Sequence, residues 1–230
     1  MDALQLSERL QQVANYVPAG ARLADIGSDH AYLPANLLLN QHIDFAVAGE
    51  VAKGPYQNVL DEIERHNLTG KLVARLANGL AAVQLTDAID VVTIAGMGGH
   101  LITQILEQNP NAKQQQPQLI LQPNTDTGLV RHWLVEHGYR LVAEKMIFDE
   151  GHYYEILVAV PGAMQLTALE AAFGPYNLVE QPENWQTYWQ RELARLKSIT
   201  VKLAQAGRQN IAAYQDYQAQ INEIEEALSL

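Results

Sequence analysis

Acidic side chains flank a tight turn near the start of the chain. The segment Asp25-Ile26-Gly27-Ser28-Asp29 follows a short apolar run and precedes a helix-like stretch. Glycine allows the backbone to turn tightly and allows a ligand to approach it closely. Two carboxylates beside such a turn disfavour a phosphate and favour a ligand that carries positive charge. The turn therefore predicts a site for a cationic small molecule, and the alternative is an ordinary turn from strand to helix.

A second acidic residue follows the next apolar run. Glu50 lies about 20 residues after Gly27, near the spacing at which an acid accepts the ribose hydroxyls of a nucleoside. S-adenosylmethionine (SAM) combines a nucleoside with a sulfonium and an ammonium group, so it suits both features. SAM is therefore the predicted cofactor.

Amides and glycines follow three further apolar runs. Asn78 offers an amide to the edge of an adenine, or it caps a short helix. The glycines of Gly96-Met97-Gly98-Gly99 would let a substrate come close to the transferable methyl group, or they serve packing alone. Gln122 and Asn124 would orient a planar base, or they form a simple turn.

The spacing of these segments indicates the elements that position them. Apolar runs alternate with amphipathic ones, which is typical of βα units and a parallel sheet. We expect strands at 22–26, 45–49, 72–76, 91–95 and 118–122, and helices at 7–16, 32–41, 54–66, 78–84, 100–108 and 126–136.

Two longer β-like runs come next, at 140–148 and 153–160, and the turn between them predicts an antiparallel hairpin. Five parallel strands closed by such a hairpin predict an α/β fold with a Rossmann-like SAM-dependent methyltransferase sheet. The glutamine run 114–116 is expected to be a loop.

The C-terminal part reads as a helical hairpin that breaks near Gly207. We expect a methyltransferase domain at 1–161 and an α-helical, coiled-coil-like domain at 162–230. Arg191, Arg195 and Lys202 fall within about 40° of one another on one helical face. This face would bind a phosphate backbone, or it is only a solvated charged surface.

Composition removes several other functions. The chain has 230 residues, no cysteine and a net charge of −11, which argues against a nucleic-acid surface over the whole molecule but not against a local one. Without cysteine, disulfides and thiolate zinc sites are excluded, and the histidines form no metal-binding pair, so no metal is expected. No apolar run reaches the roughly 18 residues of a membrane span, and no leader is evident at the start. We therefore expect a cytoplasmic protein that binds no membrane.

Several motifs resemble the bacterial tRNA (adenine(22)-N(1))-methyltransferases, the TrmK-like family that modifies an adenine of the D-arm. They are DIGSDHAYLP (25–34), AGEVAKGPYQN (48–58), IAGMGG (94–99), LQPN (121–124), GHYYEI (151–156) and FGPYNL (173–178), so the likeness covers nearly the whole chain. It implies that SAM is the cofactor and tRNA the partner. The SAM-binding residues that it implies are Asp25, Gly27, Ser28, Asp29, Glu50, Asn78, Gly79, Gly96 and Met97.

The implied reaction needs no strong base, because N1 of an unpaired adenine carries a free lone pair. The base must be looped or flipped out first. We assign catalytic roles to Asp29, beside the cationic product, and to Met97, as a soft apolar contact. The expected substrate-binding residues are Gly98, Gly99, Gln122, Asn124, Arg191, Arg195 and Lys202.

Two rival functions remain at this point. One is a SAM-dependent methyltransferase that acts on a small molecule or a protein, which the acidic net charge favours. The other is a non-catalytic nucleic-acid-binding module, against which the SAM-like first turn argues. We expect the chain to act as a monomer or a weak homodimer.

Overall fold

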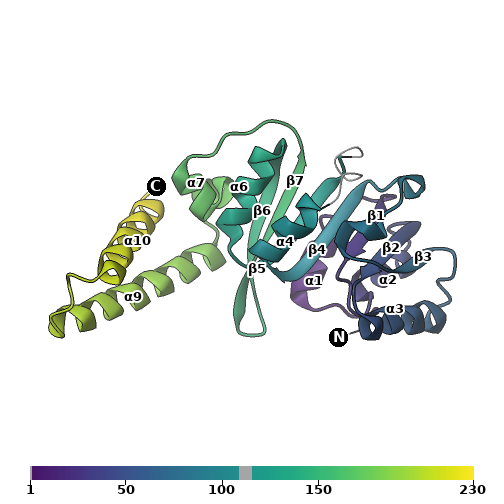
Figure 1. Ribbon diagram of the computed structural model, residues 1–230, viewed down its shortest axis with the longest axis horizontal. Coiled ribbons are helices and arrows are strands. Elements are labelled where there is room, and N and C mark those ends of the chain that lie inside the picture. The colour runs from purple at the N-terminus through teal and green to yellow at the C-terminus, as the bar shows by residue number, and fades with distance from the viewer. Residues whose placement is uncertain (1, 109–115) are drawn as a thin grey trace.

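A single mixed sheet forms the centre of the computed structural model, which describes residues 2–108 and 116–230. Within these residues seven strands lie in the order β3-β2-β1-β4-β5-β7-β6 (Figure 1). The first five are parallel, whereas β7 is antiparallel to both β5 and β6. The strands are β1 (Arg22–Ile26), β2 (Phe45–Glu50), β3 (Leu72–Leu76), β4 (Val91–Gly98), β5 (Gln118–Thr125), β6 (Tyr139–Asp149) and β7 (His152–Pro161). The expected Rossmann-like methyltransferase sheet is confirmed.

Helices cover both faces of this sheet. One face is packed by α1 (Glu8–Ala14), α2 (Tyr32–Leu39) and α3 (Lys53–Arg65). The other is packed by α4 (Gly99–Glu107), α6 (Thr127–Glu136) and the 3-10 turn η1 (Gly79–Ala82), with a second 3-10 turn at Leu85–Asp87. Neighbouring strand residues such as Leu23 and Ala24 enter opposite cores, because successive side chains of a strand alternate between its faces.

One expected element differs from the structure. The helix predicted at 78–84 is only the short 3-10 turn η1. Gly79 has a φ of +54°, in the left-handed region, so the backbone enters the turn in a conformation that an α-helix does not use. Of the glutamine run, Gln114 and Gln115 lie outside the described residues, and Gln116 lies in no helix or strand.

The C-terminal helices form the expected hairpin. After β7 the chain forms two short helices, α7 (Ala168–Phe173) and α8 (Pro175–Glu180), and then α9 (Glu183–Gln205) and α10 (Ala212–Leu228). Figure 1 shows the α9–α10 pair projecting from the β6 end of the sheet. A third apolar core, which includes Trp185 and Leu196 of α9 and Ile221 and Ile224 of α10, holds the two helices together.

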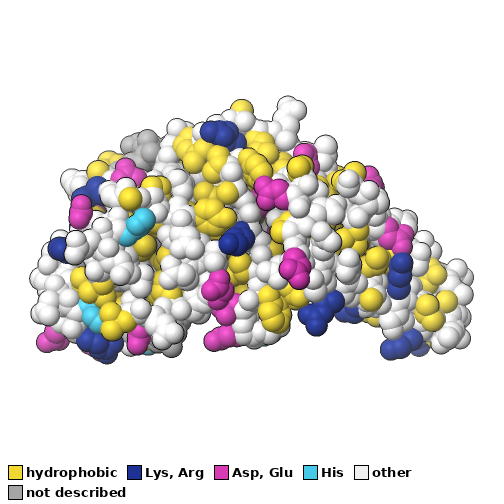
Figure 2. Space-filling view, turned by 180° about the vertical axis from the view of Figure 1, so that it is seen from behind, with side chains coloured by type: hydrophobic (Ala, Val, Ile, Leu, Met, Phe, Trp, Pro, Cys, Tyr) yellow, Lys and Arg dark blue, Asp and Glu magenta, His cyan; other side chains and the backbone are white. Residues whose placement is uncertain are grey.

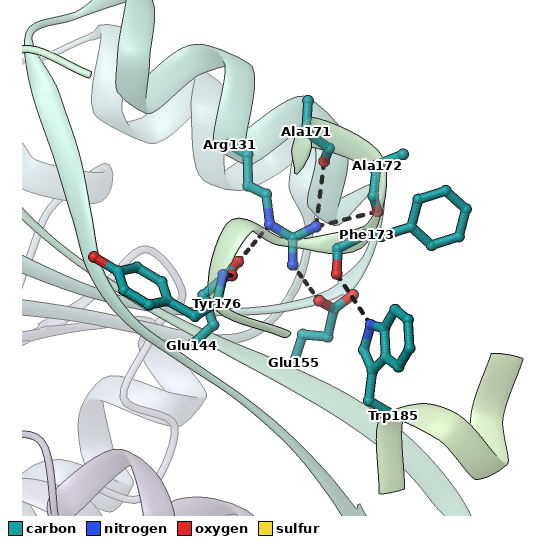
Figure 3. Close-up of polar contacts among 8 residues, drawn as sticks. All are labelled: Arg131, Glu144, Glu155, Ala171, Ala172, Phe173, Tyr176 and Trp185. Atoms are coloured by element: carbon teal, nitrogen blue, oxygen red, sulfur yellow. Dashed lines mark hydrogen bonds and ion pairs between the residues drawn. The ribbon is translucent and has the colours of Figure 1, made fainter. Parts of the chain in front are cut away.

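A buried ionic cluster joins the sheet to this C-terminal part. Arg131 of α6 is fully buried and binds Glu144 of β6, with Nε 2.6 Å from Oε1, and also Glu155 of β7 (Figure 3). Its remaining Nη1 donates to the carbonyl oxygens of Ala171 and Ala172, each at 3.3 Å. Burial alone would lower the pKa of Arg131, but the two carboxylates outweigh it and hold the pKa above its ordinary value. The guanidinium is therefore charged and fastens α7 to the sheet.

This cluster gives a physical reason for the glycine of the FGPYNL motif. Gly174 has a φ of +92°, and a Cβ there would lie 2.6 Å from a carboxylate oxygen of Glu144. The next residue, Pro175, begins α8, and the Tyr176 N–H donates to this same Glu144 oxygen, Oε2, at 3.1 Å. Any other residue at 174 would therefore push the chain away from the ion pair.

Candidate active site

The first acidic residue of the predicted turn is held inside the protein. Asp25 ends up buried at the carboxyl edge of β1, where it accepts a hydrogen bond from Thr93 Oγ1 at 2.6 Å and another from Ser28 Oγ. Burial raises the pKa of Asp25, although these two hydrogen bonds oppose the shift. Within the described residues it forms no ion pair, so its charge is available to a cationic ligand. Thr93 is a site residue that the sequence analysis missed.

The second acid reaches the same turn. Glu50, at the end of β2, is almost fully buried and accepts the backbone N–H of Asp29. Burial raises the pKa of Glu50, and the nearby carboxylates of Asp25 and Asp29 act in the same direction. The structure thus brings the acids of β1 and β2 together, as the spacing predicted. The side chain of Asp29 itself is 71 % exposed and faces His30 at 3.8 Å.

The predicted glycine of the turn meets the predicted methionine. Gly27 has a φ of +71°, and a Cβ built there would lie only 2.0 Å from Met97 Cε. Any other residue at position 27 would be strained by this φ and would displace the end of the Met97 side chain. Met97 and the first turn, 70 residues apart in the chain, are therefore direct neighbours.

A cavity of about 270 Å³ opens between these two segments. Its walls include Asp25, Gly27, Ser28, Asp29, Gly96 and Met97, all of them predicted cofactor residues. His30 and Tyr32 also line it, and their rings stack with centroids 5.0 Å apart.

Arg9 lines this cavity and is another residue that the sequence analysis missed. It comes from α1, and its Nη1 donates to Gln122 Oε1 at 2.6 Å while its guanidinium lies 5.4 Å from the centre of the Tyr154 ring. No carboxylate of the described residues pairs with this guanidinium. Only the folding of α1 across the end of β6 brings it here, through the bond from the Arg9 N–H to Asp149.

The predicted rim amides shape the glycine segment. Gln122 is fully buried, and its Oε1 accepts the Gly96 N–H at 3.0 Å, while Asn124 Nδ2 donates to the Gly96 carbonyl at 2.9 Å. The two amides also bind each other at 3.0 Å. Gln122 thus faces the protein, whereas Asn124 is exposed at the edge of the sheet.

The other glycines have different neighbours. A Cβ at Gly98 would lie 3.2 Å from Thr125 Oγ1, and one at Gly99 would lie 2.6 Å from the carbonyl oxygen of Asp126. Gly99 therefore lets α4 begin directly against the loop after β5. Gly98 is half-buried at the end of β4.

The remaining cofactor candidates lie at the end of β3. Asn78 is exposed and precedes η1 without capping it, and its Nδ2 is 3.4 Å from Gln108 Oε1. The capping alternative therefore does not describe Asn78. Gly79 packs beside Ile105 of α4. Neither residue lines the cavity of the first turn.

The basic residues predicted on α9 lie away from this cavity, and all three are exposed. Arg195 pairs with Glu192, with Nε and Oε2 2.8 Å apart, and Arg191 Nη1 is 3.3 Å from the Tyr153 hydroxyl. Figure 2 shows Lys and Arg side chains along the lower edge of the projecting helices, which lie at the right in that view. Lys197, outside the predicted set, binds Glu225 of α10 at 2.6 Å.

The described residues offer neither a membrane span nor a metal site. No helix there has the length and apolar character to span a bilayer. No group of three His, Asp or Glu side chains there is arranged to hold a metal ion.

Comparisons with known proteins agree with this geometry. The family model described as tRNA (adenine(22)-N(1))-methyltransferase, TrmK, matches residues 23–226. A tRNA (adenine(22)-N(1))-methyltransferase of Bacillus subtilis is 39% identical over 212 residues, which are 90% of this chain and 89% of that protein.

Solved structures are similar over nearly the whole chain. A Streptococcus pneumoniae protein in complex with S-adenosyl-L-methionine is 42% identical, with a TM-score of 0.89 over 97% of this chain and 100% of the other. TrmK of M. capricolum, in complex with S-adenosyl-homocysteine, is 30% identical with a TM-score of 0.86, over 97% and 98% of the two chains.

Proposed function

Because this chain belongs to the TrmK family of tRNA (adenine(22)-N(1))-methyltransferases, we propose that its first turn, Glu50 and Arg9 hold SAM beside a rim that receives the adenine. The protein is a SAM-dependent tRNA methyltransferase, and the rival small-molecule, protein-modifying and non-catalytic functions are set aside. The observation that carries the site assignment is the meeting of two buried carboxylates, Asp25 and Glu50, beside Gly27.

The donor set of the cavity fits SAM group by group. Asp25 and Asp29 give negative charge for the ammonium group of the methionine moiety. Arg9, which has no carboxylate partner within the described residues, gives a cation for the carboxylate of the same moiety. Glu50 does not line this cavity itself, but it accepts the backbone N–H of Asp29 behind the turn, and its carboxylate would accept a ribose hydroxyl. Asn78 and Gly79 would then lie toward the adenine of the cofactor.

The chemistry of the bound cofactor is that of a methyl group activated by a sulfonium. The chain contributes position: Gly96, held on both sides by Gln122 and Asn124, gives a rigid edge over which the target base would lie. Met97 covers the cavity with an apolar surface that excludes water. Such orientation is worth up to about 7–11 kcal/mol of the barrier. The exposed carboxylate of Asp29 would lie near the positive charge of the methylated adenine.

Binding of tRNA is assigned to the exposed basic face of α9. Arg191, Arg195 and Lys202 would contact the phosphate backbone and carry no sequence information. Gly98, Gly99 and Asn124 would lie at the entrance for the base. The division into a methyltransferase domain, 1–161, and a helical domain, 162–230, fits methyl transfer in the first and tRNA binding in the second. Arg131 connects the two domains.

A monomer or weak homodimer in the cytoplasm, where tRNA is found, is the proposed state. Large apolar side chains that are exposed within the described residues, such as Val51, Leu85, Val179 and Val201, come from separate elements. Singly scattered apolar residues are normal on a monomer.

Calorimetric titration with SAM tests the cofactor assignment. Glu50→Ala and Arg9→Gln should each weaken SAM binding by tenfold or more, because a hydrogen bond to a charged group contributes about 1.5–3 kcal/mol. Asp44→Ala is the matched control, since it removes an exposed carboxylate just before β2. Wild-type SAM affinity in both site variants would contradict the assignment. Transfer of labelled methyl groups to tRNA, compared in the same proteins, reports the activity.

A further inference from the structure

A second cavity, of about 210 Å³, lies between the sheet and α9. Its walls include Asn124 after β5, Tyr153 of β7, and Tyr188 and Trp189 of α9. We propose that this cavity binds an unpaired base of the tRNA other than the target adenine. The proposal rests on the proposed function, because it requires tRNA as the substrate.

The aromatic lining is the first argument. The Tyr153 and Tyr188 ring centroids are 5.4 Å apart, and those of Tyr188 and Trp189 are 4.9 Å apart. Unpaired bases of RNA are bound by stacking on such rings.

Hydrogen-bonding groups are the second argument. Trp189 Nε1 is buried and has no acceptor among the described protein atoms. This atom has almost no surface open to the cavity, so an acceptor on a bound base would reach it only if the indole ring turned toward the cavity. A ring nitrogen or carbonyl oxygen of a base is an acceptor of this kind. Burial raises the pKa of Tyr188, and Glu192 and Glu155 add to the effect, so the phenol keeps its proton and remains a donor.

Location is the third argument. Asn124, at one side of the cavity, also binds the Gly96 carbonyl that borders the cofactor cavity. Arg191 lies at the other side, with its guanidinium 5.9 Å from the centre of the Tyr153 ring, where a phosphate attached to the bound base would find a positive charge. Glu155 belongs to both the cavity wall and the Arg131 cluster, which makes that wall rigid. A base held here would fix the position of the target nucleotide next to it.

Tyr188→Leu and Trp189→Phe test the cavity in the full-length protein. The first removes a ring and nearly preserves volume, and the second keeps a ring but removes the N–H. Tyr214→Leu, on α10 and outside the cavity, is the matched control. We expect Tyr188→Leu to weaken tRNA binding about tenfold in fluorescence anisotropy, with unchanged SAM affinity and unchanged salt dependence, because stacking releases no counterions. Thermal unfolding verifies that each variant folds, and normal tRNA affinity in both folded cavity variants would overturn the proposal.

Abasic substitution identifies the bound base. Transcripts that lack one non-target base at a time in the D-arm are titrated with wild-type protein, Tyr188→Leu and Tyr214→Leu. One abasic position should cost about tenfold with the wild type and the control but nothing further with Tyr188→Leu, as coupled partners do in a double-mutant cycle. If the affinity lost through Tyr188→Leu and that lost through the abasic substitution were additive at every position, the cavity assignment would be overturned but the proposed function would not. Failure of the wild type to bind or methylate tRNA would instead overturn the proposed function, and this inference with it.

Discussion

Asp25 combines burial with a proposed role, binding the ammonium group of SAM, that requires charge. Its carboxylate is surrounded by the hydroxyls of Ser28 and Thr93 and forms no ion pair within the described residues. A carboxyl group whose pKa is raised by folding stabilises the protein below its unfolded pKa, and that contribution is lost as pH rises through the folded pKa. Under the proposed assignment, the charged form of Asp25 that would bind SAM is therefore the form that lowers the stability of the fold.

Asp25→Asn should separate these two effects. The amide keeps the shape of the side chain, so we expect SAM affinity at pH 7 to fall at least tenfold while thermal stability at pH 7 is unchanged or higher. In the wild type, SAM affinity should fall on acidification above the ordinary carboxyl range of about pH 4, because the pKa values of Asp25 and Glu50 are both raised. The variant should show a shallower loss, since one of the two carboxyl groups with a raised pKa has been removed. Calorimetry measures SAM affinity across this pH range, and thermal unfolding at each pH measures stability. The same dependence of SAM affinity on pH in the wild type and in Asp25→Asn would contradict this prediction.

Elements are joined in this protein by ionic as well as apolar contacts. Arg131 connects α6, β6, β7 and α7 through a single buried guanidinium (Figure 3). Trp185 Nε1 of α9 donates to the Phe173 carbonyl at the end of α7, at 3.0 Å, so α9 is held to the same assembly. The orientation of α9 relative to the sheet therefore depends on this cluster.

Arg131→Met should destabilise the fold by about 3–5 kcal/mol, because it leaves two buried carboxylates without their counter-charge. Urea denaturation followed by tryptophan fluorescence measures the change. Arg208→Met, at an exposed position after α9, should change stability by no more than about 0.5 kcal/mol. Combining Arg131→Met with Glu144→Gln and Glu155→Gln should recover part of the loss. A triple variant less stable than Arg131→Met would show that the unpaired charges are not the cause.

The whole molecule divides its charge unevenly. Its net charge is −11, yet α9 exposes a row of basic side chains toward one edge (Figure 2). Long-range repulsion of tRNA by the acidic surface would make this row the main electrostatic contact. Since Trp185 of α9 is fully buried, removing the helices would damage the fold, and substitutions are the better test.

Changing Arg191, Arg195 and Lys202 together to Gln should weaken tRNA binding and leave SAM binding intact. The slope of log affinity against log salt should decrease in magnitude by about one unit for each lost phosphate contact. We expect the slope to decrease by about two to three units in total, because Arg195 is already paired with Glu192 and contributes less than a free cation. Lys197→Gln is the control, since the Lys197 ammonium is paired with Glu225 and is therefore not expected to contact a phosphate of the tRNA. An unchanged slope in the triple variant would remove α9 as the phosphate-binding face.

Local signals in the sequence determined the strands and the first turn. The strands follow from short apolar runs, which are typical of a parallel sheet covered on both faces, and the acidic turn follows from residues that are adjacent in the chain. The ends of β1 and β2 then had to meet, because parallel neighbours share one carboxyl edge, so Asp25 and Glu50 were predicted together. The helical hairpin was predictable for the same reason, from a helical period that persists over both stretches.

Only the tertiary structure decided which side chains complete the site. Arg9 reaches Gln122 across 113 residues, and Met97 lies over Gly27 because two strands that are neighbours in the sheet end side by side. Gln122 turned inward to hold Gly96, although its position at a strand end suggested a substrate contact. The cavity beside Trp189 forms between β7 and α9, where Arg131 holds α7 to the sheet and Trp185 of α9 binds the end of α7. Such contacts join residues far apart in the chain, and they leave no periodic or neighbouring pattern from which sequence reasoning could recover them.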